Sequence, residues 1–265
     1  MYGCLGFSHS RFHAKAIAAL ITRTGRNILM KTKDIAENTL QFDVVYGDTD
    51  SIMINTGTNN LNSALEMGKK LKKEVNVLFR CLEIEIDGVF QSLLLLKKKK
   101  YAALKVEGWG GPDQKVVKEL KGLDMVRRDW CGLSKRVGNY VLEQILSGKQ
   151  REEVIMNLNE FLSDIGTKMK ERGILLEEYI ITKQLTKAVE SYSDFKGLPH
   201  VAVAKRLIAN GKNENDLNFV PYVICKVPDR DQKGLHLADK SFHPDEVISE
   251  KNGLEIDINW YISQQ

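Results

Sequence analysis

The stretch VVYGDTDSIMIN, Val44 to Asn55, decides the fold of the first half of the chain. FDVVY before the turn and SIMIN after it are rich in β-branched and apolar residues, which is typical of strands. GDTD between them is rich in turn-forming residues. We therefore predict a β-hairpin whose tip carries Asp48 and Asp50.

The two carboxylates at this tip need a neutralising partner. Strand alternation would point Asp48 and Asp50 the same way. Mg²⁺ suits them, because it prefers oxygen ligands and is often held by one or two carboxylates plus substrate phosphates. A calcium loop starting at Asp48 is excluded, since Met53 stands where glycine is needed and Asn59 where the bidentate Glu belongs. The plain alternative is a solvent-exposed turn, and the apolar strands around it favour the rigid metal site.

The segments around the hairpin predict an α+β region. Residues Ser8–Asn38 and Asn60–Leu82 have helical periodicity. Residues 82–107 alternate or run apolar as strands do, with Asp87-Gly88 as a turn. The apolar positions expected to face the core from the second helix are Leu61, Leu65, Leu71, Val75 and Leu78.

The lysine run KKKK, Lys97 to Lys100, lies between four leucines and Tyr101-Ala102-Ala103. Such a run is usually a solvated face. Strand alternation would send Lys97 and Lys99 to one face and Lys98 and Lys100 to the other. Fixed lysines beside a tyrosine suit a phosphate backbone. An acidic metal site together with a basic track is what phosphoryl transfer on nucleic acid requires.

The second half of the chain has a different character. Residues Arg128–Gly148 and Arg151–Gly173 read as two helices, each ending at a glycine. The sheet pattern stops near Asp124 to Arg128, where we place a boundary. The expected architecture is an antiparallel sheet with flanking helices in residues 1–125, followed by a mostly helical region in residues 126–265.

Composition adds only broad limits. The chain has 265 residues, 43% of them hydrophobic, and a net charge of +4, which alone identifies no nucleic-acid partner. No stretch approaches the roughly 20 apolar residues of a membrane span, and the start lacks a signal-peptide layout. The cysteines show no metal-ligand spacing, so we interpret them as reduced, buried thiols in an intracellular compartment; they are Cys4, Cys81, Cys131 and Cys225.

Five segments, in order, resemble those of the family B replicative DNA polymerases. YGDTDS looks like motif C of that family, KKKKYAA like its lysine-tyrosine motif, and MYGCLGF like the tail of its motif B helix. KGLDMVRRDW and LPHVAVAKRL are similar to its thumb segments. The likeness covers almost the whole chain.

The resemblance implies a palm in residues 1–125 and a thumb in residues 126–265. It implies a DNA-directed DNA polymerase in which two Mg²⁺ ions activate the primer 3′-hydroxyl and stabilise the leaving pyrophosphate. The expected partners are primer–template DNA or an RNA–DNA primer, deoxynucleoside triphosphates, a primase and a regulatory subunit. The expected location is the nucleus.

The resemblance assigns to each matching residue the role that its position has in the family's motif. Asp50 would be a metal ligand and Asp48 its close companion, both in the catalytic centre. Thr49 and Ser51 would shape the turn beside the nucleotide. Tyr2 and Gly3 would line the nascent base pair. The duplex backbone or minor groove would be contacted by Lys98, Lys99, Lys100 and Tyr101. Arg127 and Arg128 would contact DNA at the start of the thumb. For the two arginines, a surface basic pair or a helix-start charge cluster is an equal alternative.

Several parts of the family pattern are absent from the 265 residues. The second catalytic aspartate strand and the motif B lysine and asparagine do not occur. We expect Met1 not to be a true start, the chain to be a fragment, and the fragment alone to be inactive, since a further aspartate must come from outside it.

Two other functions remain open. One is a non-catalytic duplex DNA-binding module, a truncated paralogue in which the aspartates are relics. The other is a nuclease using Glu83, Glu85 and Asp87, although an alternating acidic strand is often only a solvated face.

Overall fold

The computed structural model describes residues 2–109, 111, 113–123, 125, 127–193, 197–227, 234–249 and 253–264. Met1 and Asp124, on which two of the expectations rest, lie outside these ranges. The chain divides into two compact units, Met1–Lys121 and Gly122–Gln265. Both combine helices with antiparallel strands, so the chain is of the mixed α+β class, as predicted.

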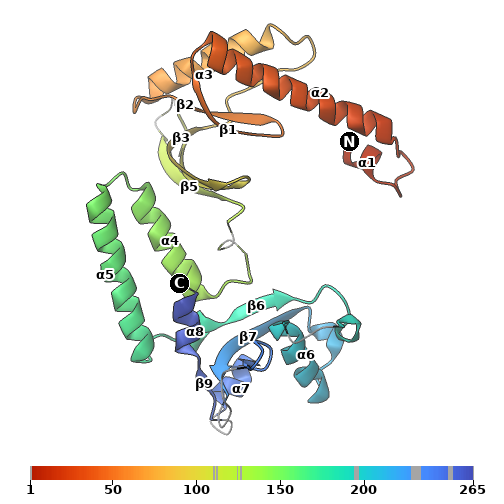
Figure 1. Ribbon diagram of the computed structural model, residues 1–265, viewed down its shortest axis with the longest axis vertical. Helices are drawn as coiled ribbons and strands as arrows, with labels where there is room; N and C mark the ends of the chain where they lie inside the picture. Colours follow the sequence, from red (N-terminus) through yellow and green to blue (C-terminus); the bar gives the residue numbers. More distant parts are fainter. Residues whose placement is uncertain are drawn as a thin grey trace. The chain divides into compact units, whose positions relative to one another are not determined.

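The first unit contains three α-helices, a π-helix and five strands within its described residues (Figure 1). They are α1 (Tyr2–Gly6), α2 (Lys15–Asp34), the π-helix η1 (Ile35–Thr39), β1 (Asp43–Asp48), β2 (Ser51–Asn55), α3 (Leu61–Asn76), β3 (Val89–Lys97), β4 (Lys100–Glu107) and β5 (Lys115–Lys121).

The single helix predicted over Ser8–Asn38 is wrong at its start. Residues 7–14 form turns, in which the Ser10 hydroxyl accepts from the Phe12 N–H at 3.2 Å and the Phe7 carbonyl meets the His13 ring at 3.1 Å. Polar side chains that bond to nearby backbone in this way compete with helix formation. The regular helix therefore begins only at Lys15.

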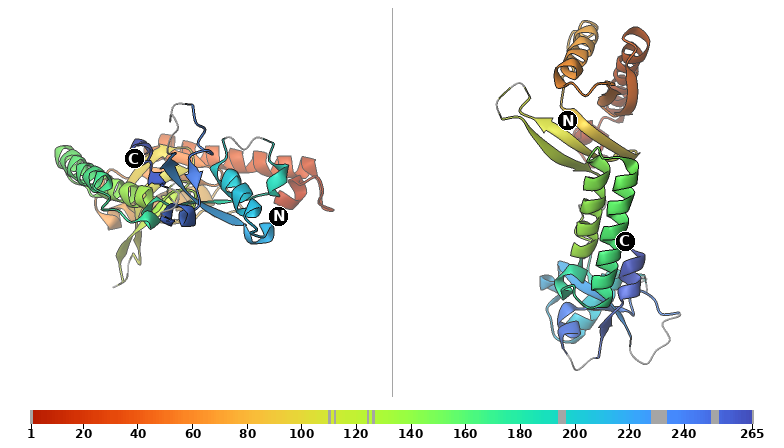
Figure 2. Two further views of the ribbon diagram at one scale, coloured as in Figure 1. Left: turned by 90° about the horizontal axis from the view of Figure 1, so that it is seen from below. Right: turned by 90° about the vertical axis from the view of Figure 1, so that its left-hand side faces the viewer.

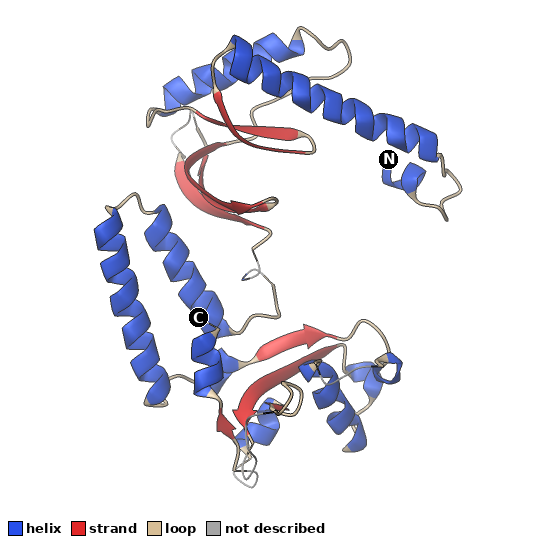
Figure 3. Cartoon of the chain, in the orientation of Figure 1, coloured by secondary structure: helices blue, strands red, loops and turns tan. Residues whose placement is uncertain are grey.

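The strands of the first unit form two sheets instead of the single sheet that we predicted (Figure 3). β1 and β2 pair as an antiparallel hairpin, which confirms the prediction for this stretch. β3, β4 and β5 form a separate antiparallel sheet in that order. Residues 82–88 are not a strand: the Asn76 side chain instead accepts from the Ile84 N–H at 2.7 Å and donates to its carbonyl at 3.2 Å.

The lysine run forms the tip of a hairpin, so the predicted alternation of four lysines along one strand is wrong. β3 ends at Lys97, β4 begins at Lys100, and the two residues are paired. Lys98 and Lys99 make the turn, where Lys99 adopts a left-handed φ of 62°. The run reverses the chain because the apolar strands on both sides pair with each other.

Helix α3 packs its apolar face on a small core. The Asn60 side chain caps its N-terminus, accepting from Asn62 N–H at 2.9 Å. Leu65, Leu71 and Val75 are buried, as predicted. Leu78 was expected in the same stripe, but it follows the end of the helix and is 57% exposed.

The second unit contains five α-helices and four strands within its described residues (Figures 1 and 2). They are α4 (Gly132–Leu146), α5 (Arg151–Lys170), β6 (Ile181–Gln184), α6 (Pro199–Ala209), β7 (Phe219–Lys226), β8 (Ser241–Phe242), α7 (Pro244–Ile248), β9 (Glu255–Ile256) and α8 (Ile258–Ser263), with short 3₁₀ turns η3 (Leu176–Tyr179), η4 (Val189–Ser191) and η5 (Glu214–Asp216).

The two helices predicted for this unit, α4 and α5, are confirmed and lie side by side (Figure 2). The expectation that the sheet pattern stops near Asp124 is wrong. β7 pairs antiparallel with β6, β8 and β9. Three of these strands have only two to four residues, too few for a hydrophobic alternation to be recognised in the sequence.

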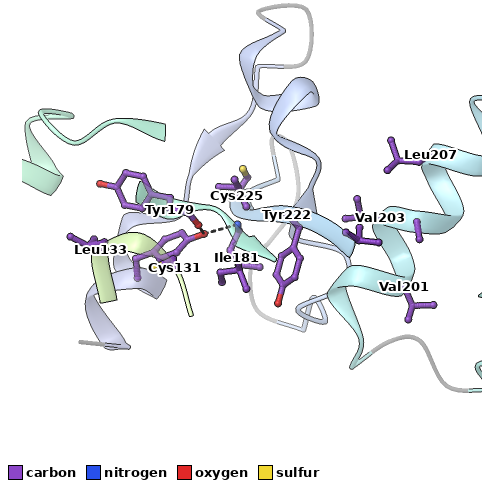
Figure 4. Packing of buried hydrophobic residues seen from close by; sticks show 14 of the residues in the cluster. Cys131, Leu133, Tyr179, Ile181, Val201, Val203, Leu207, Tyr222 and Cys225 are labelled. Atoms are coloured by element: carbon purple, nitrogen blue, oxygen red, sulfur yellow. Dashed lines mark hydrogen bonds between the residues drawn. The ribbon is translucent and has the colours of Figure 1, made fainter. Parts of the chain in front are cut away.

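The core of the second unit gathers side chains from both helices and strands (Figure 4). Tyr261 of α8 lies in this core and has no exposed surface. The Tyr261 hydroxyl donates to the Tyr179 carbonyl at 2.7 Å and accepts from the Ile224 N–H at 3.1 Å. One phenol therefore connects α8, η3 and β7.

Two of the four cysteines depart from the expectation of buried thiols. Cys131 and Cys225 are buried, whereas Cys4 and Cys81 are exposed, and all four are free. Burial raises the pKa of the Cys225 thiol to about 12. None of the helices formed by the described residues combines the length and apolar character that a bilayer crossing requires.

Candidate functional site

The tip of the β1–β2 hairpin is a tight two-residue turn of Thr49 and Asp50. Thr49 has a left-handed φ of 50°, which is strained for a β-branched residue. The Asp48 carbonyl accepts from the Asp50 N–H at 2.6 Å, and the Thr49 hydroxyl donates to the Asp48 carboxylate at 3.2 Å. Asp48 ends the strand while Asp50 lies in the turn, so the strand alternation used to relate them does not apply.

The neutralising partner of Asp48 in this structure is a lysine. Lys99 Nζ lies 3.0 Å from Asp48 Oδ2, and the side chains are 63% and 21% exposed, respectively. The hydrogen bond from Lys99 and its charge lower the pKa of the Asp48 carboxyl, against a smaller opposing effect of burial. The same contact raises the pKa of Lys99. The tip of the lysine hairpin thus meets the tip of the acidic hairpin.

A second bond joins the two hairpins. The Lys99 N–H donates to the Tyr46 hydroxyl at 2.9 Å, across 53 residues of sequence. Tyr46 precedes Asp48 by two residues on β1, so both side chains share one face. We did not single out Tyr46 from the sequence. The available signal was its alternation with Asp48.

Tyr101 and Lys100 begin β4 immediately after the lysine turn. The Tyr101 hydroxyl donates to Glu119 of β5 at 2.8 Å. Burial, followed by Glu119, raises the pKa of the Tyr101 phenol. Glu119 carried no sequence signal, because a single acidic residue in a half-exposed strand is ordinary.

The other expected site residues are not all gathered at the hairpin tips. Lys98 is exposed in the lysine turn. Tyr2, 57% exposed, and Gly3 lie on α1. Arg127 and Arg128 belong to the second unit and are exposed, with the Arg128 guanidinium 5.0 Å from the centre of the Phe219 ring.

The carboxylates suit a hard cation in chemistry but do not complete a site. Among the described residues, no group of three or more His, Cys, Asp or Glu side chains is arranged to hold a metal ion. Asp48 and Asp50 offer the oxygen donors that Mg²⁺ prefers, and Mg²⁺ commonly takes its other ligands from substrate phosphates and water. The nuclease alternative gains no support, since Glu85 pairs with Lys72 at 3.1 Å.

The two hairpin tips thus bring the Asp48 carboxylate and the Lys99 ammonium group together. Comparison with known proteins identifies the family: the family described as DNA polymerase family B matches residues 1–265. The chain belongs to this family, as the motif resemblance implied.

Two of the similar proteins share one description. The chain is 69% identical over 270 residues to the DNA polymerase alpha catalytic subunit of Sterkiella nova, and 46% identical over 266 residues to that of Xenopus laevis. Each comparison covers 100% of this chain and 18% of the relative, so the chain spans about a fifth of their length. The solved family B DNA polymerase of the archaeon Pyrobaculum calidifontis has a TM-score of 0.68 and 26% identity, covering 100% of this chain and 30% of that one.

Proposed function

We propose that residues 1–125 form the palm and residues 126–265 the thumb of a replicative DNA-directed DNA polymerase, which adds deoxynucleotides to a primer 3′ end as the template directs. The observation that carries this proposal is the junction of Asp48 with Lys99. It brings the Asp48 carboxylate against the lysine turn, and Asp50 follows two residues later in the exposed tip of the same hairpin. The similarity to polymerase alpha catalytic subunits supports the same assignment.

In this proposal the residues of the two hairpins have separate tasks. Asp50 is exposed in its turn and holds a metal ion. Asp48 orders the turn by accepting the hydrogen bond of the Thr49 hydroxyl, and it assists Asp50 in binding the metal. Asp50 would hold Mg²⁺ together with a further aspartate from outside these 265 residues, and the bound ions would supply the positive charge that favours ionisation of the primer 3′-hydroxyl and departure of pyrophosphate. Thr49 shapes the turn beside the incoming triphosphate.

The positive groups bind the duplex. Lys98, Lys99 and Lys100 are placed for phosphate contacts close to the chemistry, and Tyr101 for the minor groove. Arg127 and Arg128 contact DNA from the thumb. Tyr2 and Gly3 of α1 line the nascent base pair. The full protein acts in the nucleus on primer–template DNA or an RNA–DNA primer, together with a primase and a regulatory subunit.

The test is a lysine replacement in the protein at its native length. Lys97 to Lys100 are all changed to alanine, and duplex affinity is measured as salt is raised. Every lysine that binds a phosphate adds about one to the log–log salt slope, so its replacement should lower the slope by that amount. A matched control replaces the four lysines Lys69, Lys70, Lys72 and Lys73 of α3, and its slope should stay near that of the unmodified protein. An unchanged slope in the first variant would refute the proposed phosphate binding.

A non-catalytic duplex-binding module is the second candidate. The observation in its favour is that Lys98 and Lys99 are exposed at the tip of the lysine hairpin, where binding a duplex needs no metal. Primer extension separates the two functions. The native-length protein should extend a primer, Asp50→Asn should abolish extension, and the isolated 265-residue chain should be inactive. Duplex binding without extension by the native-length protein would favour the module.

A further inference from the structure

Glu119 occupies a defined place on one face of the β3–β4–β5 sheet. In the register of β4 and β5, Glu119 pairs with Ala103, and Tyr101 pairs with Lys121. Residues two apart on a strand share a face, so Tyr101, Ala103 and Lys105 lie on the face of Glu119. Ala103 is fully buried and small. Its short side chain leaves room for Glu119 to lie between Tyr101 and Lys105.

The Glu119 carboxylate is enclosed by donors. It accepts from the Tyr101 hydroxyl at 2.8 Å through Oε1. Lys105 Nζ lies 3.7 Å from Oε2, and Lys121 Nζ lies 3.9 Å from Oε1. The Glu119 side chain is only 22% exposed. Two ammonium groups thus balance its charge, and a carboxylate can only accept hydrogen bonds.

This arrangement determines what the Tyr101 oxygen can offer. A phenol has one hydroxyl proton, and Tyr101 uses it to donate the hydrogen bond to Glu119. Only the lone pairs of the oxygen remain for another molecule. A phenol is already protonated at neutral pH, and burial together with Glu119 raises the pKa of Tyr101 further. The ring is also held by Phe90, with centroids 6.1 Å apart. Tyr101 therefore presents a fixed acceptor.

Few groups in the minor groove of a duplex donate hydrogen bonds. A·T pairs show only acceptors there, and guanine adds the N2 amine. A ribose strand adds 2′-hydroxyls. We propose that Glu119 is a positioning residue that makes Tyr101 a hydrogen-bond acceptor, which recognises a minor-groove donor of the bound duplex, either a ribose 2′-hydroxyl or a guanine amine. This rests on the proposed duplex contact of Tyr101.

The test compares duplexes that differ by one donor. The native-length protein is titrated with a primer–template carrying ribose or deoxyribose at the primer end, and with one carrying guanine or hypoxanthine, which lacks the amine. We expect a preference of about threefold to tenfold for the donor in one of the two pairs, the size that one hydrogen bond supplies. The pair that shows the preference identifies the source of the donor.

Variants then show whether Glu119 acts by positioning the Tyr101 hydroxyl or only by stabilising the folded protein. Tyr101→Phe and Glu119→Ala should abolish the preference, and Glu119→Gln, whose amide oxygen still accepts, should restore most of it. Glu107→Ala is the matched control, because Glu107 is paired with Lys115 at 3.5 Å at the other end of β4. It should keep the preference. Unfolding midpoints confirm that each variant is folded.

Two results would overturn the inference. One is a preference that Tyr101→Phe removes and Glu119→Ala leaves intact, which would mean that Tyr101 needs no positioning. The other is equal affinity for both members of each pair while Tyr101→Phe weakens all binding. If neither Tyr101→Phe nor the lysine replacement affects any duplex, the proposed nucleic-acid contact itself has failed, and the inference with it.

Discussion

Replacing Tyr261 by phenylalanine should destabilise the second unit by about 2–4 kcal/mol. The ring stays, and with it the edge contact to Tyr179, whose ring centroid is 5.0 Å away. Only the hydroxyl is removed. Its removal leaves the Tyr179 carbonyl and the Ile224 N–H without their partner in a fully buried place. Each orphaned group costs about 1–2 kcal/mol.

The loss of stability is measurable by urea unfolding followed through tryptophan fluorescence. Trp260 packs edge-on against Tyr261, with centroids 4.8 Å apart, and reports on this region. The thermal midpoint should fall by roughly 6–12 °C. Tyr140→Phe is the matched control, since the Tyr140 ring stacks on Phe161 and its hydroxyl bonds to none of the described residues. A loss below about 0.5 kcal/mol for Tyr261→Phe would refute the assigned role of the two bonds.

Two further predictions concern the charge of a buried histidine and the backbone at two glycines with positive φ. His200 is 4% exposed, and burial with Lys183 nearby lowers its pKa to about 4. Since an unfolded histidine titrates near pH 6.5, the stability that the neutral ring supplies should be complete above that pH and be lost as the pH falls towards 4, by up to about 1.4 kcal/mol per pH unit. His200→Gln should flatten this part of a plot of the urea midpoint against pH. The same plot for His200→Gln and the unmodified protein would contradict the assigned role of His200. Gly108 has φ +66°, and an added Cβ would lie 2.6 Å from the Asp113 carbonyl oxygen, whereas Gly148 has φ +73° and open space around it. Gly148→Ala should therefore cost about 1–2 kcal/mol from backbone strain alone, and Gly108→Ala clearly more; equal losses in denaturant unfolding would exclude the clash.

Local pattern was enough to predict several elements. The β1–β2 hairpin follows from β-branched runs around turn residues, and α4 and α5 follow from helical period closed by glycines. The buried stripe of α3 was also correct over Leu65, Leu71 and Val75. In each case, neighbouring residues carry the information.

What the sequence did not reveal depends on contacts between distant segments. Lysines are not turn residues, so nothing local marks Lys98 and Lys99 as a hairpin tip. Their position follows from the pairing of β3 with β4. Likewise, the bonds of Lys99 to Asp48 and Tyr46 join two hairpins that each look complete by themselves. The resemblance to the polymerase family assigned expected roles to these residues, but it did not predict that the acidic and basic ones touch.

The contact between the two hairpins has a consequence for protein engineering. Asp48 and Lys99 form one contact in the structure, although they lie on separate hairpins of the chain. A graft that transfers the YGDTDS hairpin alone would bring an acidic tip to a host that lacks its lysine. Charge reversal at Lys99 would bring a second carboxylate against Asp48. Chimaeras of related chains should therefore exchange both hairpins together.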